Sequence, residues 1–177
     1  LLRKLNFDFV NAGKLQVLFR SVCAKGWSDA VKKIMKHPDK SGFILSKDDE
    51  GKTGFIKACS NGHIKVVELF LKQQLRNDII VQQDKSEEAG FIHAYLNKRE
   101  DIVEALLNLP NKDEMLNFSF QGSCKMGHYG VVELLLKQGN SQEIISSKDQ
   151  QGENGFMKAC QTGQREIVAL LLNNPNL

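Results

Sequence analysis

The sequence lacks an excess of charge of either sign. Its 177 residues contain 24 Lys and Arg against 21 Asp and Glu, which gives a formal net charge of +3 at pH 7. A surplus this small cannot by itself hold a nucleic acid or an anionic membrane surface. We therefore expect no nucleic-acid partner, and a partner has to be recognised by shape and local contacts.

Long apolar runs are also missing. The longest runs, such as Leu134 to Leu136, are far shorter than the roughly 20 residues that a transmembrane helix needs. The first residues show no basic segment followed by an apolar one, which is the pattern of a secretory signal. We expect no membrane insertion. Because the chain begins Leu1-Leu2 and not with Met, and the start resembles the tail of an earlier helix, we interpret it as a fragment of a longer chain.

Cysteine is scarce, with four residues in the chain. They do not form the dense pattern of a small secreted disulfide scaffold, so we expect reduced thiols in an intracellular, cytoplasmic protein. A content of 41% apolar and 25% charged residues is that of an ordinary globular chain and excludes disordered or collagen-like classes.

What the sequence does contain is an internal repeat. The segment 54–59, Gly-Phe-Ile-Lys-Ala-Cys, recurs at 155–160 as Gly-Phe-Met-Lys-Ala-Cys. With the Phe as the register residue, five copies can be aligned, at Phe19, Phe55, Phe91, Phe120 and Phe156. Self-similarity at this spacing is typical of stacked repeat architectures.

Each copy has the pattern of two helices. The segment after the register Phe predicts a short helix that ends at a glycine such as Gly62, and the run at 64–71 predicts a longer amphipathic helix. Polar segments between the pairs carry turn residues, because Gly51 follows Asp48 and Gly152 follows Asp149 by three positions. The residues that extend the repeat are predicted to be plain insertions in the loop after the second helix. We predict an all-α solenoid of helix-turn-helix repeats with protruding hairpin-like loops, forming a single array over 1–177.

The best copy resembles the ankyrin repeat. Residues 48–58 read Asp-x-x-Gly-x-Thr-Gly-Phe-Ile-x-Ala, which is similar to the ankyrin pattern Asp-x-x-Gly-x-Thr-Pro-Leu-His-x-Ala, and Gly62-His63 follow as in that family. The resemblance covers roughly residues 12–174. Because the Pro and His of the pattern are absent, we expect looser hairpins. The third copy has Lys98-Arg99 in place of Gly-His, and the fourth comes seven residues early, without a full hairpin.

Residues with catalytic or metal-binding chemistry occupy repeated positions. The cysteines all lie four residues after a register Phe and are predicted to be buried packing residues, because thiols one repeat apart cannot converge on one zinc ion: Cys23, Cys59, Cys124 and Cys160. His63 and His128 also share one position, as expected for a structural or surface role. Gly51-Lys52-Thr53 lacks the earlier glycine of a phosphate-binding loop, since Ser46 stands there. We expect no enzyme activity, metal or cofactor.

The resemblance to ankyrin repeats implies a monomeric protein–protein interaction module that binds its partner on a concave face of loops and short helices. Carried over position by position, the predicted partner-binding residues are Asp49, Glu50, Lys52, Ser60, Asn61, Lys85, Ser86, Glu88, Leu96, Asn97, Lys125, Met126, Gln150, Gln151, Glu153, Gln161 and Thr162. The alternative is a passive scaffold or spacer segment within a larger, possibly enzymatic, multidomain protein.

Overall fold

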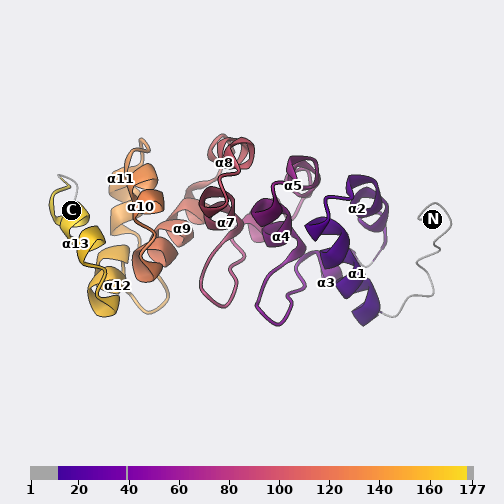
Figure 1. The fold of residues 1–177 in the computed structure, drawn as a ribbon, viewed down its shortest axis with the longest axis horizontal. Helices are drawn as coiled ribbons and strands as arrows, with labels where there is room; N and C mark the ends of the chain where they lie inside the picture. Colours follow the sequence, from indigo (N-terminus) through magenta and orange to yellow (C-terminus); the bar gives the residue numbers. More distant parts are fainter. Residues whose placement is uncertain (1–11, 39, 175–177) are drawn as a thin grey trace. The chain divides into compact units, whose positions relative to one another are not determined.

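The computed structural model describes residues 12–38 and 40–174, and in this part the chain forms thirteen helices and no strand (Figure 1). The Leu1-Leu2 segment lies outside the described residues. The helices are α1 (Ala12–Ala24), α2 (Ser28–Ile34), α3 (Lys40–Ile44), α4 (Gly54–Asn61), α5 (Ile64–Leu71), α6 (Arg76–Ile80), α7 (Gly90–Leu96), α8 (Glu100–Leu107), α9 (Asp113–Met126), α10 (Tyr129–Leu136), α11 (Ser141–Ser146), α12 (Gly155–Thr162) and α13 (Arg165–Leu172). The predicted all-α class is confirmed.

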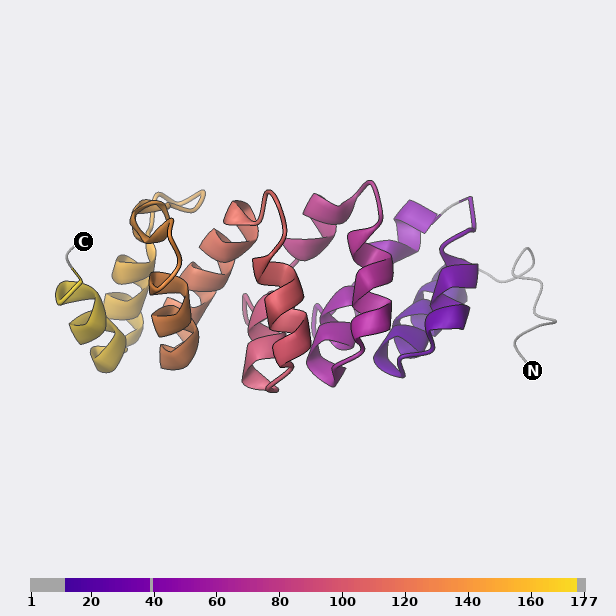
Figure 2. The ribbon, with the colours of Figure 1, turned by 90° about the horizontal axis from the view of Figure 1, so that it is seen from above.

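The contacts between residues divide the chain into two compact units. Unit 1 holds α1 to α8 and ends at Leu107, without the short segment Ser86–Glu88. Unit 2 holds that segment together with α9 to α13. In unit 1, α1 packs on α4 and α4 packs on α7, while the paired helices α4 and α5 lie side by side (Figure 2). In unit 2, α9 packs on α12.

The ends of the short helices are fixed by the residues that the sequence places there. Thr53 caps α4 by accepting a hydrogen bond from the backbone N–H of Ile56, at 3.3 Å. Gly62 ends the same helix with a φ of 80°, in the left-handed region that glycine adopts without strain. Lys98 takes the equivalent place in the third repeat with a φ of 56°.

Two details of the predicted repeat are wrong. The second helix is not regularly longer than the first, because α4 and α5 each have eight residues, as do α12 and α13, while α1 and α9 are longer than α2 and α10. The second helix is the longer one in the third repeat, where α8 has eight residues and α7 has seven. The residues after the second helix are not plain loop insertions, since they form the third helices α3, α6 and α11. Each of these helices buries an apolar pair, namely Phe43 with Ile44, Ile79 with Ile80, and Ile144 with Ile145. Burial of that pair explains why the segment folds onto the repeat.

The fourth repeat has no hairpin, as predicted. Helix α9 begins at Asp113 and runs for 14 residues, so its first turns occupy the stretch of sequence that forms a hairpin in the second, third and fifth repeats. Hairpins precede α4, α7 and α12, at residues 46–53, 82–89 and 147–154, and we call them the second, third and fifth hairpins. In the third hairpin, Glu87 has a φ of 62° where the other two have Gly51 and Gly152.

Glycine at the start of a short helix fits against the phenylalanine of the preceding repeat. A methyl group placed on Gly90 would lie 2.7 Å from Cε1 of Phe55, and one placed on Gly155 would lie 2.5 Å from Cε1 of Phe120. Gly54 packs in the same way on Phe19 and Cys23. The large ring of the register Phe therefore explains why glycine stands where the ankyrin pattern has proline.

The prediction that all four cysteines are buried is wrong at one position. Cys23, Cys59 and Cys124 are buried, whereas Cys160 is exposed. In the first three cases the following repeat of the same unit covers the thiol, as Gly90 covers Cys59. Cys160 lies in the fifth repeat, and no helix of the described residues packs over it.

Side chains that follow the inter-helix turn join neighbouring repeats by hydrogen bonds. His63 contacts the carbonyl oxygen of Ala24 at 2.9 Å through Nε2, and Arg99 donates from Nε to the carbonyl oxygen of Ser60 at 3.2 Å. In unit 2, Gln164 donates to the carbonyl oxygen of Lys125 at 3.2 Å. This position links repeats in both units, as the repeated occurrence of His63 and His128 in the sequence led us to expect of a structural site.

Candidate partner-binding surface

A side-chain contact of an aspartate ties each full hairpin to the short helix that follows it, and in two hairpins this contact is an ion pair with a lysine. Nζ of Lys57 lies 2.6 Å from Asp48, and Nζ of Lys158 lies 2.7 Å from Asp149. The same two aspartates also accept backbone N–H groups of their own turns, as Asp48 does from Lys52 at 2.8 Å. The hairpins are therefore held in place by a contact that the ankyrin pattern does not contain, although the Pro and His are absent.

These contacts shift the pKa values of the aspartates. Burial raises the pKa of Asp48, but hydrogen bonds from Lys57 and from the turn outweigh burial and hold the pKa below its ordinary value of 3.8. The hydrogen bond from Lys158 is the main cause that lowers the pKa of Asp149. Both hairpins thus depend on an ionised carboxylate.

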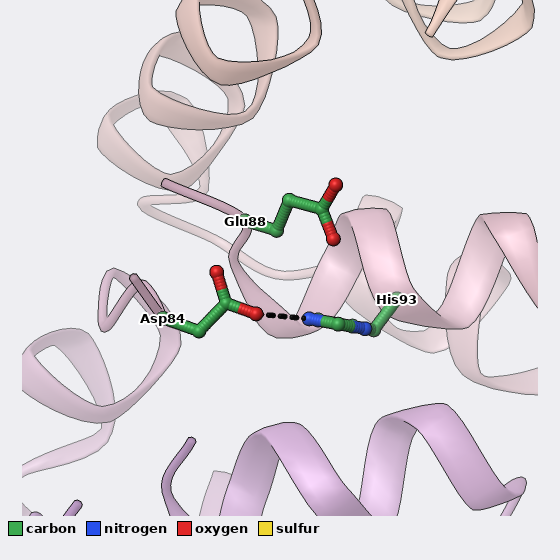
Figure 3. A group of neighbouring side chains, drawn as sticks. All are labelled: Asp84, Glu88 and His93. Atoms are coloured by element: carbon green, nitrogen blue, oxygen red, sulfur yellow. Dashed lines mark hydrogen bonds and ion pairs between the residues drawn. The ribbon is translucent and has the colours of Figure 1, made fainter. Parts of the chain in front are cut away.

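In the third hairpin a histidine takes the place of the lysine. Nε2 of His93 lies 2.8 Å from Oδ2 of Asp84, and both side chains are largely buried (Figure 3). Sequence reasoning missed all three pairs and placed no carboxylate near His93. The signal was present, because in each case the aspartate precedes its partner by nine residues.

The turns of the three hairpins leave two equivalent positions exposed, and the first of the two carries a different charge in each hairpin. It directly follows the paired aspartate and holds an acid, a base and an amide in the three hairpins, namely Asp49, Lys85 and Gln150. Of the 17 residues predicted to bind a partner, the structure exposes these three together with Glu50, Asn61, Ser86, Leu96, Asn97, Met126, Gln151, Gln161 and Thr162. Within each unit, we call the hairpins and the exposed ends of the short helices its hairpin face.

The remaining five predicted residues, Lys52, Ser60, Glu88, Lys125 and Glu153, are partly buried, and each of them has a hydrogen bond or ion pair within the chain. Glu88 lies 2.6 Å from Nε2 of His128. Lys125 pairs with Glu87, whose second oxygen lies 3.8 Å from Nζ of Lys158. Segment Ser86–Glu88 is therefore fixed to α9 and α12 by charged contacts.

Two large apolar residues of the predicted set are exposed. Leu96 in unit 1 is 44% exposed and Met126 in unit 2 is 42% exposed. Sequence reasoning did not select Trp27, Tyr129 or Met157, which are exposed to a similar degree. Exposed apolar side chains of this size are typical anchors for a protein partner.

A groove of about 330 Å³ lies between α9 and the fifth hairpin in unit 2. It is lined by Glu114, Asn117, Phe118, Gln121, Ser147, Lys148, Asp149 and Gln150. Gln121 in this lining donates from Nε2 to the carbonyl oxygen of Ser147 at 3.2 Å. Of the lining residues, the sequence prediction included Gln150 alone.

No helix within residues 12–38 and 40–174 is long and apolar enough to cross a membrane. The sequence model of a family described as ankyrin repeats, in three copies, matches residues 18–118, which is more than half of the chain. A search of curated proteins finds no match.

Proposed function

This chain belongs to the ankyrin-repeat family, whose members are generally non-enzymatic protein–protein interaction modules, and we propose that it binds a partner protein on its hairpin face. The observation that carries the proposal is the exposed hairpin position that holds Asp49, Lys85 and Gln150. The paired aspartate beside it is the same in all three hairpins. A constant frame that presents a different side chain in each repeat supplies the distinct contacts that specific recognition needs.

The charges of the hairpin face favour a protein over a nucleic acid. Glu50 pairs with Lys52 at 2.8 Å, and acidic Asp49 stands where the next hairpin has basic Lys85. A face of mixed charge offers no continuous row of cations for phosphates. Leu96 and Met126 add apolar anchors, one in each unit.

A pair of charge-reversed variants tests the face. The first combines Asp49→Lys with Lys85→Glu on the hairpins, and the matched control combines Lys65→Glu with Glu68→Lys on the exposed side of α5. Both variants keep the net charge, and all four residues are exposed, so the melting temperature should stay close to that of the wild type. We expect proteins captured from a cell extract by the wild-type chain and by the control to be lost with the hairpin variant.

Other results would contradict the proposal. Loss of the captured proteins with the α5 variant alone would place the binding site on the side of the second helices. If the wild-type chain captures no protein above the level of an unrelated helical repeat, the spacer function is supported instead.

A further inference from the structure

Neighbouring hairpins in unit 1 are joined through their backbones. The N–H of Lys85, directly after the paired aspartate of the third hairpin, donates to the carbonyl oxygen of Glu50 in the second hairpin at 3.0 Å. Lys47 of the second hairpin also donates from Nζ to the carbonyl oxygen of Gln83, at 2.7 Å. A hairpin thus uses this N–H group to contact the hairpin of the repeat before it.

The fifth hairpin has the equivalent N–H group, but no hairpin of a preceding repeat lies beside it. Gln150 occupies the position of Lys85, but the fourth repeat has helix α9 in place of a hairpin. Among the described residues, no acceptor takes the backbone N–H of Gln150. Gln150 is one of the residues that line the groove, and an N–H group without a protein acceptor is available to a ligand.

A buried atom of one lining residue also lacks a partner. Oδ1 of Asn117 on α9 is buried and accepts no hydrogen bond among the described residues. At the equivalent position of α1 the longer side chain of Gln16 reaches the carbonyl oxygen of Gly42, at 3.2 Å. Because this oxygen is covered by the protein, the group that the groove offers to a ligand is the N–H of Gln150, and the half-buried ring of Phe118 lies in the same lining.

We propose that this groove binds an extended peptide segment of a partner protein, which replaces the missing hairpin of the fourth repeat. A backbone carbonyl of the segment accepts from the N–H of Gln150, and an apolar side chain of the segment packs on Phe118. This inference rests on the proposed function and names the chemistry of one bound segment.

The charges of the lining fit an uncharged peptide backbone better than an anion. Glu114 and Lys148 contribute one charge of each sign, and Asp149 is already paired with Lys158 at 2.7 Å. The groove volume of about 330 Å³ lies at the lower end of the range typical of ligand sites. A phosphate group would find no net positive charge here.

The test uses two substitutions of Gln150 in the full chain. Gln150→Pro removes the N–H, and proline fits the second position of the turn that Gly152 closes on Asp149 at 3.0 Å. Gln150→Ala removes the same side chain but keeps the N–H, so the ratio of the two affinities measures the backbone bond alone. The probe is a displayed library of random seven-residue peptides, selected on the wild-type chain and then titrated by fluorescence anisotropy.

We expect the selected peptides to bind Gln150→Pro about tenfold more weakly than Gln150→Ala, as the loss of one hydrogen bond implies. Phe118→Ala should weaken the same peptides independently of the turn. Peptides that bind both Gln150 variants equally, or a library that yields none, would overturn the proposal.

Two further outcomes would also overturn it. If the wild-type chain dimerises in light scattering and Gln150→Pro does not, the occupant is a second copy. If peptide selection fails while the Asp49 and Lys85 variant still loses its captured proteins, the groove is not a peptide site but the hairpin face remains the partner site.

Discussion

The position two residues after the register Phe is filled by Lys57, His93 and Lys158, and each of these side chains reaches back to an aspartate of its own hairpin. The aspartate is constant, whereas its partner side chain is lysine in two hairpins and histidine in the third. The residue after the aspartate is exposed and differs in each hairpin. Some positions of the repeat thus hold the hairpin on its helix, and the exposed position after the aspartate remains available for a partner.

The four thiols should differ in their reactivity. Burial raises the pKa of Cys124 to about 12 and also raises those of Cys23 and Cys59, so these thiols are protonated and covered at neutral pH. We expect an alkylating reagent to modify Cys160 alone in the native protein and all four thiols in denaturant, as measured by mass spectrometry. Rapid native labelling of Cys59 would show that the stacked repeats open readily.

The left-handed turn at Lys98 should be improved by glycine. Lys98→Gly is expected to stabilise the chain by up to about 1 kcal/mol, because glycine adopts a positive φ without the steric cost that lysine has. The matched control is Lys72→Gly at the end of α5, where φ is −86° and glycine should destabilise the chain. Urea unfolding midpoints measure both changes. If Lys72→Gly stabilised the chain as much as Lys98→Gly, the explanation by the positive φ of Lys98 would be contradicted.

At the scale of helices, packing between repeats depends on a close approach of backbone and ring. Gly54, Gly90 and Gly155 each begin a short helix against a Phe of the preceding repeat in the same unit. A larger residue at these positions needs a smaller one across the contact. Glycine in place of the pattern's proline and phenylalanine in place of its leucine therefore depend on each other, because the glycine of one repeat packs on the phenylalanine of the repeat before it.

The close contact between Gly90 and Phe55 predicts that a single added methyl group lowers the stability of unit 1. Gly90→Ala should destabilise unit 1 by about 1–3 kcal/mol, because the new Cβ would lie 2.7 Å from the ring of Phe55. Gly42→Ala in α3 is the control, since no atom lies within 4 Å of its new methyl group and alanine favours the helix.

A double substitution separates this contact from a general effect on α7. Phe55→Leu removes part of the ring, so the loss caused by Gly90→Ala should be smaller in that background. Equal losses in both backgrounds, measured by urea unfolding, would show that the ring is not the cause.

For the molecule as a whole, the hairpins link stability to pH. The pKa values of Asp48 and Asp149 are lower in the folded chain than their ordinary value of 3.8. Below that ordinary value the unfolded chain binds protons that the folded chain does not, so stability is present above it and is lost as the pH falls through the folded pKa values.

This linkage can be measured directly. We expect the melting temperature to fall as the pH is lowered below about 4, the region in which ordinary aspartates protonate. The double variant Asp48→Asn with Asp149→Asn should melt lower at pH 7 and show a smaller further loss in acid. A wild-type chain whose melting temperature is constant from pH 6 to pH 2 would contradict this role of the ion pairs.

The sequence by itself determined the repeat, the helical class and the positions of the turns. These features depend on local patterns, since apolar spacing defines a helix face and glycine marks a left-handed end, as at Gly62 and Gly163. It also indicated the missing hairpin of the fourth repeat, because the register Phe came early. The exposed hairpin residues followed from the same alignment of repeats.

Only the tertiary structure decided which groups meet. The contact of Glu88 with His128 and the groove beside Gln150 join residues whose separation in the sequence does not predict the distance between them. The third helices were missed because an apolar pair in a polar segment forms a helix only when a neighbouring surface buries it. Cys160 was misjudged because burial depends on the repeat that packs over a residue, and not on the residue itself.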